Sequence, residues 1–149
     1  MRLPIFLMVA GTLFVAGGHA SAQTPSPGSE AAWAGEARYW ADQKAGNSAD
    51  YINLFDDNFT GWPCRRPQPE QKSDVKKKTL SASQSDITID QQHSVVGSSF
   101  VITYYRVTER IKLGDGKTET IVKNFTHTWI PTHDGWKIAG GMCRPAPTE

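Results

Sequence analysis

The sequence predicts an α+β domain in which helices come first and an antiparallel sheet follows. Apolar residues recur at helical spacing from Trp33 to Phe55, and from Asp86 onward the period changes to the alternation that is typical of strands. Two turn signals, Asp115-Gly116 and Asp134-Gly135, join successive strands of the second part. No internal repeat is visible, so a single domain is expected.

A secretory signal peptide is predicted at residues 1–22. Arg2 supplies the positive start, residues 5–16 are almost entirely apolar, and Ala20-Ser21-Ala22 offers small residues for cleavage. The apolar run is shorter than the roughly 20 residues that span a membrane, which disfavours an anchor. We therefore expect a bacterial periplasmic or secreted protein with no stable membrane insertion after cleavage.

Composition divides the rest of the chain into three parts. Residues 23–31 predict a flexible lead-in rich in Pro, Ser and Gly, residues 32–145 a single domain, and residues 146–149 a tail. Once Arg2 is removed, basic and acidic residues are equal in number, and nothing indicates a nucleic-acid partner. The run Lys76-Lys77-Lys78 is interpreted as a solvated face.

Two helices in tandem are expected at the start of the domain. The first keeps a helical period until Gly46-Asn47 ends it. Ser48 is the expected N-cap of the second helix, whose apolar face runs from Tyr51 to Phe55. Pro residues then predict a loop over residues 61–69, and residues 73–81 form either a third short helix or solvated chain.

Three consecutive antiparallel strands are predicted over residues 98–113, 117–130 and 136–144. Two-residue turns would place Tyr104 opposite His127 and would leave room for an indole where Gly140 faces Trp129. In that register the following residues share the inward face of the sheet: Phe100, Ile102, Tyr104, Arg106, Phe125, His127, Trp129, Ile138 and Met142. A three-residue turn would slip the register and pair the faces differently.

The alternation of Phe125, His127 and Trp129 places an imidazole between two aromatic rings, which is typical of a small-molecule pocket. In the preceding loop, Trp62 either covers the pocket mouth or packs on the core. Arg65-Arg66 either attracts a carboxylate ligand at the rim or is simply exposed. The candidate ligand-binding residues are Trp62, Tyr104, Arg106, Phe125, His127, Trp129 and Met142.

Two cysteines, Cys64 and Cys143, remain after signal cleavage. In an oxidising compartment a single disulfide between them is the economical interpretation, with two free thiols as the alternative. His93, His127 and His133 fall on different segments or faces. No metal site and no cofactor is therefore expected.

The order of elements and four short motifs carry a resemblance to a known family. The motifs are Leu54-Phe55-Asp56-Asp57-Asn58-Phe59, Gly61-Trp62-Pro63-Cys64, Thr126-His127-Thr128-Trp129 and Asp134-Gly135-Trp136-Lys137-Ile138. Over residues 33–144 the chain resembles the SnoaL-like, ketosteroid-isomerase-like group of the nuclear-transport-factor-2-like superfamily. It is similar to exported bacterial members with a domain of unknown function (the 4440 type, DUF4440). The resemblance implies a cone-shaped fold, in which a curved sheet wraps around the helices and encloses a pocket, and it implies no single reaction.

The resemblance also implies that an isomerase would hold a carboxylate base inside the cone, and the predicted inward face has none. Asp56 and Asp57, at the end of the second helix, are the carboxylates best placed to point into the cone. The alternative is that both side chains are solvated. His127 with Tyr104 forms either a general base and its hydrogen-bond donor or a structural hydrogen bond. The candidate catalytic residues are His127, Tyr104 and Asp57.

The expected function is the binding of a small apolar or amphipathic molecule in the cone pocket. One alternative is an acid–base enzyme, an isomerase, lyase or hydrolase, that acts on such a molecule. Another is a dimeric scaffold without a ligand, because the outer face of such a sheet can pair with a second copy. The sequence leaves open whether the chain is an enzyme, and the missing carboxylate favours binding.

Overall fold

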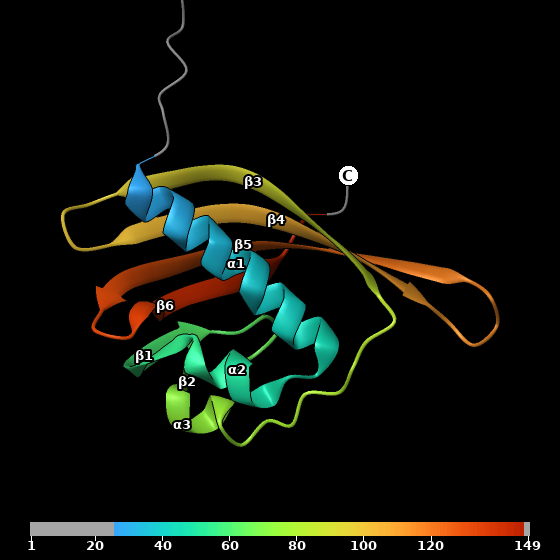
Figure 1. The fold of residues 1–149 in the computed structure, drawn as a ribbon. Helices are drawn as coiled ribbons and strands as arrows, with labels where there is room; N and C mark the ends of the chain where they lie inside the picture. Colours follow the sequence, from blue (N-terminus) through green and yellow to red (C-terminus); the bar gives the residue numbers. More distant parts are fainter. Residues whose placement is uncertain (1–25, 148–149) are drawn as a thin grey trace, which may run out of the picture.

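A six-stranded sheet curves around one long helix in the computed structural model, which describes residues 26–147 (Figure 1). The elements are α1 (Pro27–Ala45), α2 (Ser48–Asn53), β1 (Phe55–Trp62), β2 (Glu70–Gln71), α3 (Lys72–Val75), β3 (Asp86–Val96), β4 (Val101–Lys112), β5 (Thr118–Thr132) and β6 (Gly135–Pro145). The predicted signal peptide lies outside the described residues.

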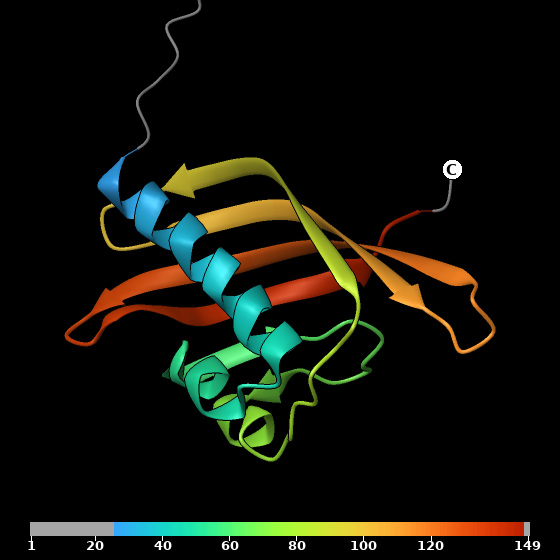
Figure 2. The same ribbon diagram turned by 45° about the vertical axis from the view of Figure 1, so that its right-hand side comes forward.

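The sheet has the strand order β2-β1-β6-β5-β4-β3. Neighbouring strands are antiparallel except β1 and β6, which run parallel and make the sheet mixed. Helix α1 lies across the concave face, while α2 and α3 sit beside β1 (Figures 1 and 2). The predicted fold class, an α+β arrangement with a curved sheet around N-terminal helices, is confirmed.

Helix α1 begins earlier than the sequence predicts. Pro27 occupies the first turn, where a missing N–H costs nothing, and the Ser26 side chain accepts the Ser29 N–H as an N-cap. The helix ends as predicted at Gly46, which has φ +73° in the left-handed region. The prediction of a flexible lead-in over residues 23–31 is therefore wrong from Pro27 onward.

The second helix is shorter than predicted, because the chain becomes a strand at Phe55. Strand β1 pairs in parallel with β6, for example Phe55 with Ile138 and Gly61 with Gly141. Parallel strands need a long connection, so β6 lies far from β1 in the sequence and no local pattern predicts that they pair. The interpretation of Asp56 and Asp57 as the end of a helix is wrong, since both belong to this strand.

The turn between β4 and β5 has three residues, and this sets the register. Leu113 N–H donates to the Lys117 carbonyl at 2.8 Å, and Gly116 has φ +81°. Thr103 therefore lies opposite His127, and Tyr105 lies opposite Phe125. The predicted pairing of Tyr104 with His127 is wrong by one residue, which turns every β4 side chain to the other face of the sheet.

The turn between β5 and β6 also differs from the prediction. Thr132 pairs with Gly135, so the two turn residues are His133-Asp134, and a bulge follows between Thr128 and Trp129. Gly141, rather than Met142, therefore lies opposite His127. A Cβ on Gly141 would clash with the Thr126 carbonyl oxygen and lie 2.6 Å from the His127 ring, so this glycine leaves room for the imidazole. The Trp129 indole is accommodated by Gly35 of α1, where a Cβ would lie 2.5 Å from its ring, and not, as predicted, by Gly140.

The core lies between α1 and the concave face of the sheet. It is dominated by aromatic rings and comprises Ala32, Tyr39, Trp40, Tyr51, Leu54, Phe55, Phe59, Val75, Val101, Tyr105, Val107, Phe125, Trp129 and Ile138. Among residues 26–147, no helix is both long enough and apolar enough to cross a membrane.

Candidate functional site

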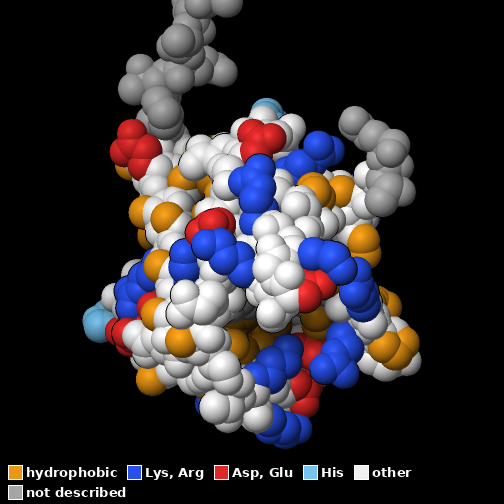
Figure 3. All heavy atoms as spheres, turned by 90° about the vertical axis from the view of Figure 1, so that its right-hand side faces the viewer, with side chains coloured by type: hydrophobic (Ala, Val, Ile, Leu, Met, Phe, Trp, Pro, Cys, Tyr) orange, Lys and Arg blue, Asp and Glu red, His pale blue; other side chains and the backbone are white. Residues whose placement is uncertain are grey.

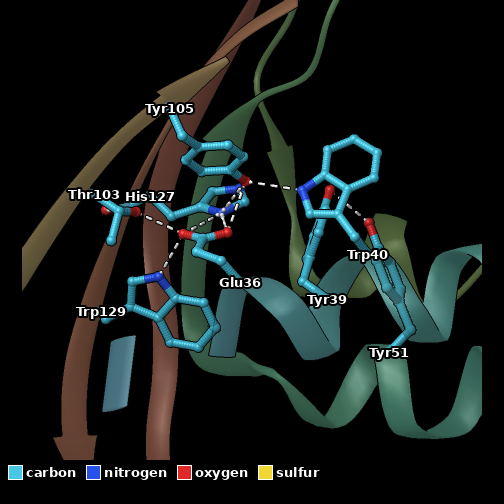
Figure 4. A network of polar contacts seen from close by, with 8 residues as sticks. All are labelled: Glu36, Tyr39, Trp40, Tyr51, Thr103, Tyr105, His127 and Trp129. Carbon is cyan, nitrogen blue, oxygen red and sulfur yellow. Dashed lines mark hydrogen bonds and ion pairs between the residues drawn. The ribbon is translucent and has the colours of Figure 1, made fainter. Parts of the chain in front are cut away.

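A carboxylate from α1 is buried at the centre of the molecule. Glu36 is 1 % exposed and reaches from the helix toward strands β4 and β5 (Figure 4). Thr103 Oγ1 donates to its Oε1 at 2.6 Å, and the Tyr105 hydroxyl donates to Oε2 at 2.7 Å. From β5, Trp129 Nε1 donates at 2.7 Å, and His127 Nδ1 lies 2.9 Å from Oε2. One carboxylate thus accepts hydrogen bonds from four side chains.

The strand register brings the four donors together. Thr103 and Tyr105 alternate along β4 and so share its inner face, as His127 and Trp129 do along β5. Thr103 and His127 are direct cross-strand partners, which places both beneath the helix. Glu36 lies on the buried stripe of α1, because it is four residues from both Ala32 and Trp40, two core residues.

Glu36 is held in its ionised form. Burial raises its pKa, but the neighbouring His127 charge and the hydrogen bonds from His127, Thr103 and Tyr105 outweigh burial and leave the pKa below the ordinary value. A carboxylate only accepts hydrogen bonds, so His127 Nδ1 carries a proton. Nε2 is then left over: it accepts a hydrogen bond when the ring is neutral and donates one when the ring is the imidazolium whose charge lowers the Glu36 pKa.

A cavity of about 290 Å³ opens beside this network. His127 lies on its wall, and its Nε2 has no hydrogen-bond partner among residues 26–147. Seven aromatic residues also line the cavity: Tyr39, Trp40, Tyr51, Phe55, Phe59, Trp62 and Phe125. The cavity therefore combines an aromatic wall with an oriented imidazole, and polar and charged side chains complete its lining.

Two further phenols adjoin the imidazole. The Tyr51 hydroxyl donates to the Tyr39 hydroxyl at 3.0 Å, and the Tyr39 ring packs against His127 with the ring centroids 4.9 Å apart. Burial raises the pKa of both phenols, and burial together with the charge of Glu36 raises the pKa of Tyr105 far above its ordinary value. All three phenols are therefore neutral donors or acceptors at neutral pH.

The structure brings only part of the predicted site together. Phe125 and His127 line the cavity, Trp62 borders its mouth with its Nε1 donating to the Arg66 carbonyl, and Trp129 is buried in the Glu36 network. Among the candidates, His127 both hydrogen-bonds within the network and lines the cavity, and Phe125 lines the cavity and stacks on Tyr105.

The other candidates face outward. Tyr104 and Arg106 lie on the convex face of β4, so the prediction that they point into the cone is wrong for the register reason given above. Met142 is 55 % exposed, although it touches the edge of the cavity. Asp57 is exposed and forms an ion pair with Lys72 at 2.8 Å, so it does not look into the cone.

The residues that orient His127 are not among the predicted site residues. The predicted carboxylates were Asp56 and Asp57 and did not include Glu36, and the predicted register places Thr103 and Tyr105 on the outer face of β4. A signal was present for Glu36: it is a lone charge between Ala32 and Trp40 on the apolar stripe of the helix. Its spacing indicates burial, and a buried carboxylate requires partners.

The predicted disulfide is confirmed and belongs to the cavity wall. Cys64 follows β1 and Cys143 lies in β6, with their Cα atoms 4.7 Å apart. Both cysteines line the cavity, so the bond ties the loop after Trp62 to the sheet at the mouth. Across residues 26–147, no cluster of three or more His, Cys, Asp or Glu side chains is arranged to hold a metal ion.

Comparisons with known proteins identify the architecture. No protein-family model and no curated protein sequence matches the chain, so the closer resemblance to the exported group of unknown function stays a prediction. Many solved structures do match. A protein of the NTF2-like family from Streptomyces avermitilis has a TM-score of 0.71 at 12 % identity and covers 83 % of this chain and 100 % of its own.

Two other solved structures come from differently named proteins. A ketosteroid isomerase-like protein from Erwinia carotovora has a TM-score of 0.63 at 14 % identity, covering 80 % of this chain and 96 % of its own. The CaMKII hub of S. rosetta has a TM-score of 0.66 at 15 % identity, covering 83 % of this chain and 100 % of its own. Identities this low establish a shared fold and leave the function to the site.

Proposed function

We propose that this chain, which has the nuclear-transport-factor-2-like fold, binds a small apolar or amphipathic molecule in the cavity beside His127. The fold is compatible with ligand binding and with catalysis. The cavity volume of about 290 Å³ is near the lower end for ligand sites, which commonly span about 300–1,000 Å³. A ligand built on a single ring fits that volume.

The free Nε2 of His127 is the observation that carries this proposal. Glu36 fixes Nδ1, so the ring cannot turn to satisfy Nε2 elsewhere. Nε2 then hydrogen-bonds a polar group of the ligand, accepting from a hydroxyl or N–H when the imidazole is neutral and donating to an oxygen when it is charged, while the aromatic side chains of the wall contact the apolar part of the ligand. The Tyr39 and Tyr51 hydroxyls add a second polar point on the same wall.

Histidine NMR tests this proposal directly. Small phenols and aromatic alcohols are titrated into the protein, and the Cε1–H resonances of the histidines are followed. Binding in the cavity moves the resonance of His127 and leaves that of the exposed His133 in place. Ligands that bind without moving the His127 resonance, or a complete lack of binding, would overturn the proposal.

Acid–base catalysis is the second candidate, and the Glu36–His127 pair favours it. A neutral imidazole whose Nδ1–H is bound by a carboxylate takes a proton at Nε2, and the carboxylate stabilises the resulting imidazolium. Tyr105, not Tyr104, is the phenol that hydrogen-bonds this pair. If a bound ligand is turned over, Glu36→Gln should abolish turnover and retain binding. Equal turnover in Glu36→Gln would exclude this role.

Export through a cleaved signal peptide is also proposed. The Cys64–Cys143 disulfide supports an oxidising compartment, because disulfides persist in secreted and periplasmic proteins. The intact mass of the protein recovered from the periplasm of an expressing bacterium tests this. A mature chain that begins at Gln23 is expected, and full-length protein confined to the cytoplasm contradicts the proposal.

Self-association is proposed for the convex face of the sheet. Tyr104 and Met142 are exposed there, and CaMKII hub and association domains are among the structural matches. A dimer in light scattering that Tyr104→Lys converts to a monomer would support this surface. A monomeric wild-type protein would exclude it.

A further inference from the structure

Charged side chains gather at the mouth of the cavity. Arg66, Lys78 and Lys123 line it together with a single carboxylate, Glu70. On one side of the molecule, the surface shows an apolar hollow bordered by Lys and Arg side chains (Figure 3). Apolar walls and a cationic border suit a ligand that has an apolar body and an anionic end.

The mouth keeps a surplus of positive charge after its ion pairs are counted. Arg66 Nε lies 3.8 Å from Glu70, and Lys78 pairs with the same carboxylate. Lys123 is neutralised separately by Glu109 at 2.8 Å. Since Arg66 and Lys78 share one carboxylate, one positive charge is left without a counter-ion among residues 26–147.

Arg66 is held at the mouth by its backbone. Cys64 is bonded to Cys143 in β6, Arg65 has φ +63°, and the Arg66 carbonyl accepts the Trp62 Nε1–H at 2.8 Å. A left-handed conformation at a non-glycine residue is strained and persists where surrounding contacts impose it. The Arg66 side chain itself remains 65 % exposed, and its two terminal nitrogens have no partner among the described residues.

We infer that the ligand is a small amphipathic carboxylate whose head binds Arg66 and Lys78. This rests on the proposed function, because the apolar body lies in the same cavity. A guanidinium fork matches the two oxygens of a carboxylate, and one surplus charge suits a monoanion better than a dianion. Lys123 and His127 are four residues apart on β5, about 13 Å, so a single ring with a short acidic chain spans from the mouth toward the imidazole.

A matched pair of probes tests the charge of the ligand. 4-Hydroxycinnamate and 4-hydroxycinnamyl alcohol share a phenol and a ring and differ in the anionic end. Calorimetric titration at low salt should show the carboxylate binding about tenfold more tightly, as expected for one charge-assisted contact. Added salt should reduce this preference, because the mouth is open to solvent.

Variants separate the mouth from the rest of the site. Arg66→Gln combined with Lys78→Gln should remove the preference for the carboxylate and leave the affinity for the alcohol unchanged. Arg65→Gln is the control, since Arg65 is exposed and does not line this cavity. It should retain the full preference.

The outcomes distinguish the two proposals. Equal affinity of wild-type protein for both probes overturns the inference of an anionic ligand and leaves the proposed cavity function in place. A preference that survives in the double variant overturns the assignment to Arg66 and Lys78. Binding of neither probe overturns both proposals, because the cavity then takes neither a charged nor a neutral single-ring ligand.

Discussion

The inner end and the mouth of the cavity each hold a carboxylate with several partners, in opposite settings. At the inner end, Glu36 is 1 % exposed and accepts hydrogen bonds from four buried or nearly buried side chains. At the mouth, Glu70 is 15 % exposed and pairs with Arg66 and Lys78, whose side chains are 65 % and 40 % exposed. The inner network is buried throughout, whereas the ion pairs at the mouth are open to solvent on the side of their cations.

Solvent decides what each carboxylate contributes. Buried donors that lose their acceptor recover nothing from water, so the inner carboxylate stabilises the fold and fixes the His127 ring. Exposed ion pairs exchange readily with water and add little to stability. Arg66 and Lys78 are therefore free to bind a ligand, whereas Glu36 is committed to the network.

Removing the inner carboxylate should have the largest effect. Glu36→Ala leaves four donors without their acceptor, and breaking a buried charged network typically costs about 3–5 kcal/mol. Urea unfolding measures the loss. Glu30→Ala is the control on the same helix, because Glu30 is exposed in the first turn and its loss should cost less than about 1 kcal/mol. Equal losses in the two variants would remove the contrast between buried and exposed carboxylates.

Removal of the disulfide at the mouth should have the second-largest effect on the free energy of unfolding. Cys64 and Cys143 are separated by 79 residues, and the chain-entropy model gives about 4 kcal/mol for a loop of this size, with about 2–4 kcal/mol typical of measured bonds. The double variant Cys64→Ala with Cys143→Ala should lower the free energy of unfolding accordingly. Because neither cysteine belongs to the Glu36 network, the His127 Cε1–H resonance should stay in place. A shifted His127 resonance would show that the two ends are coupled.

Low pH should reduce the stability that the Glu36 network contributes more than the stability that exposed ion pairs contribute. The pKa of Glu36 lies below its ordinary value of 4.5 in the folded protein, so its contribution to stability is present above that value and is lost as pH falls through the folded pKa. Urea midpoints measured from about pH 6 down to about pH 3 should therefore fall more steeply for wild type than for Glu36→Gln. Asp57→Asn is the exposed comparison. The pKa of Asp57 is also lowered, by its hydrogen bond to Lys72, but solvent screens that pair and the slope should stay close to wild type.

The inner end also shows how far the sequence predicts the site. The alternation of Phe125, His127 and Trp129 correctly gave the inner face of β5, because the other face of this strand carries Thr126 and Thr128. Strand β4 offers no such contrast, since large residues occupy both of its faces. Its register depends on whether the Gly-Asp-Gly turn contains two residues or three between the paired strand ends. A two-residue turn would make Tyr104 the partner of the imidazole, and the three-residue turn makes it Tyr105.

The features that the sequence does not predict depend on pairing between segments that are far apart in the chain. Strand β1 contains Asp, Asn and Gly, which local propensity disfavours in strands, and it is a strand because β6 lies beside it. The burial of Glu36 is also not predicted, because helix periodicity places it among core residues while its charge suggests the surface. The four donors that keep it buried come from strands more than 60 residues away along the chain. Only the folded topology shows that they meet.

The smallest effect on stability is expected at the mouth, where the cations of the ion pairs are open to solvent. Glu70→Gln removes the carboxylate that Arg66 and Lys78 share, which should cost at most about 1 kcal/mol in urea unfolding. The same change frees both cations, so the preference for 4-hydroxycinnamate over its alcohol should increase. Asp115→Asn, which breaks the exposed pair with Lys117 at the tip of the β4–β5 hairpin, is the control for stability and should leave the preference unchanged. If Glu70→Gln destabilises the protein as much as Glu36→Ala does, the mouth is part of the structural core and not a solvated binding rim.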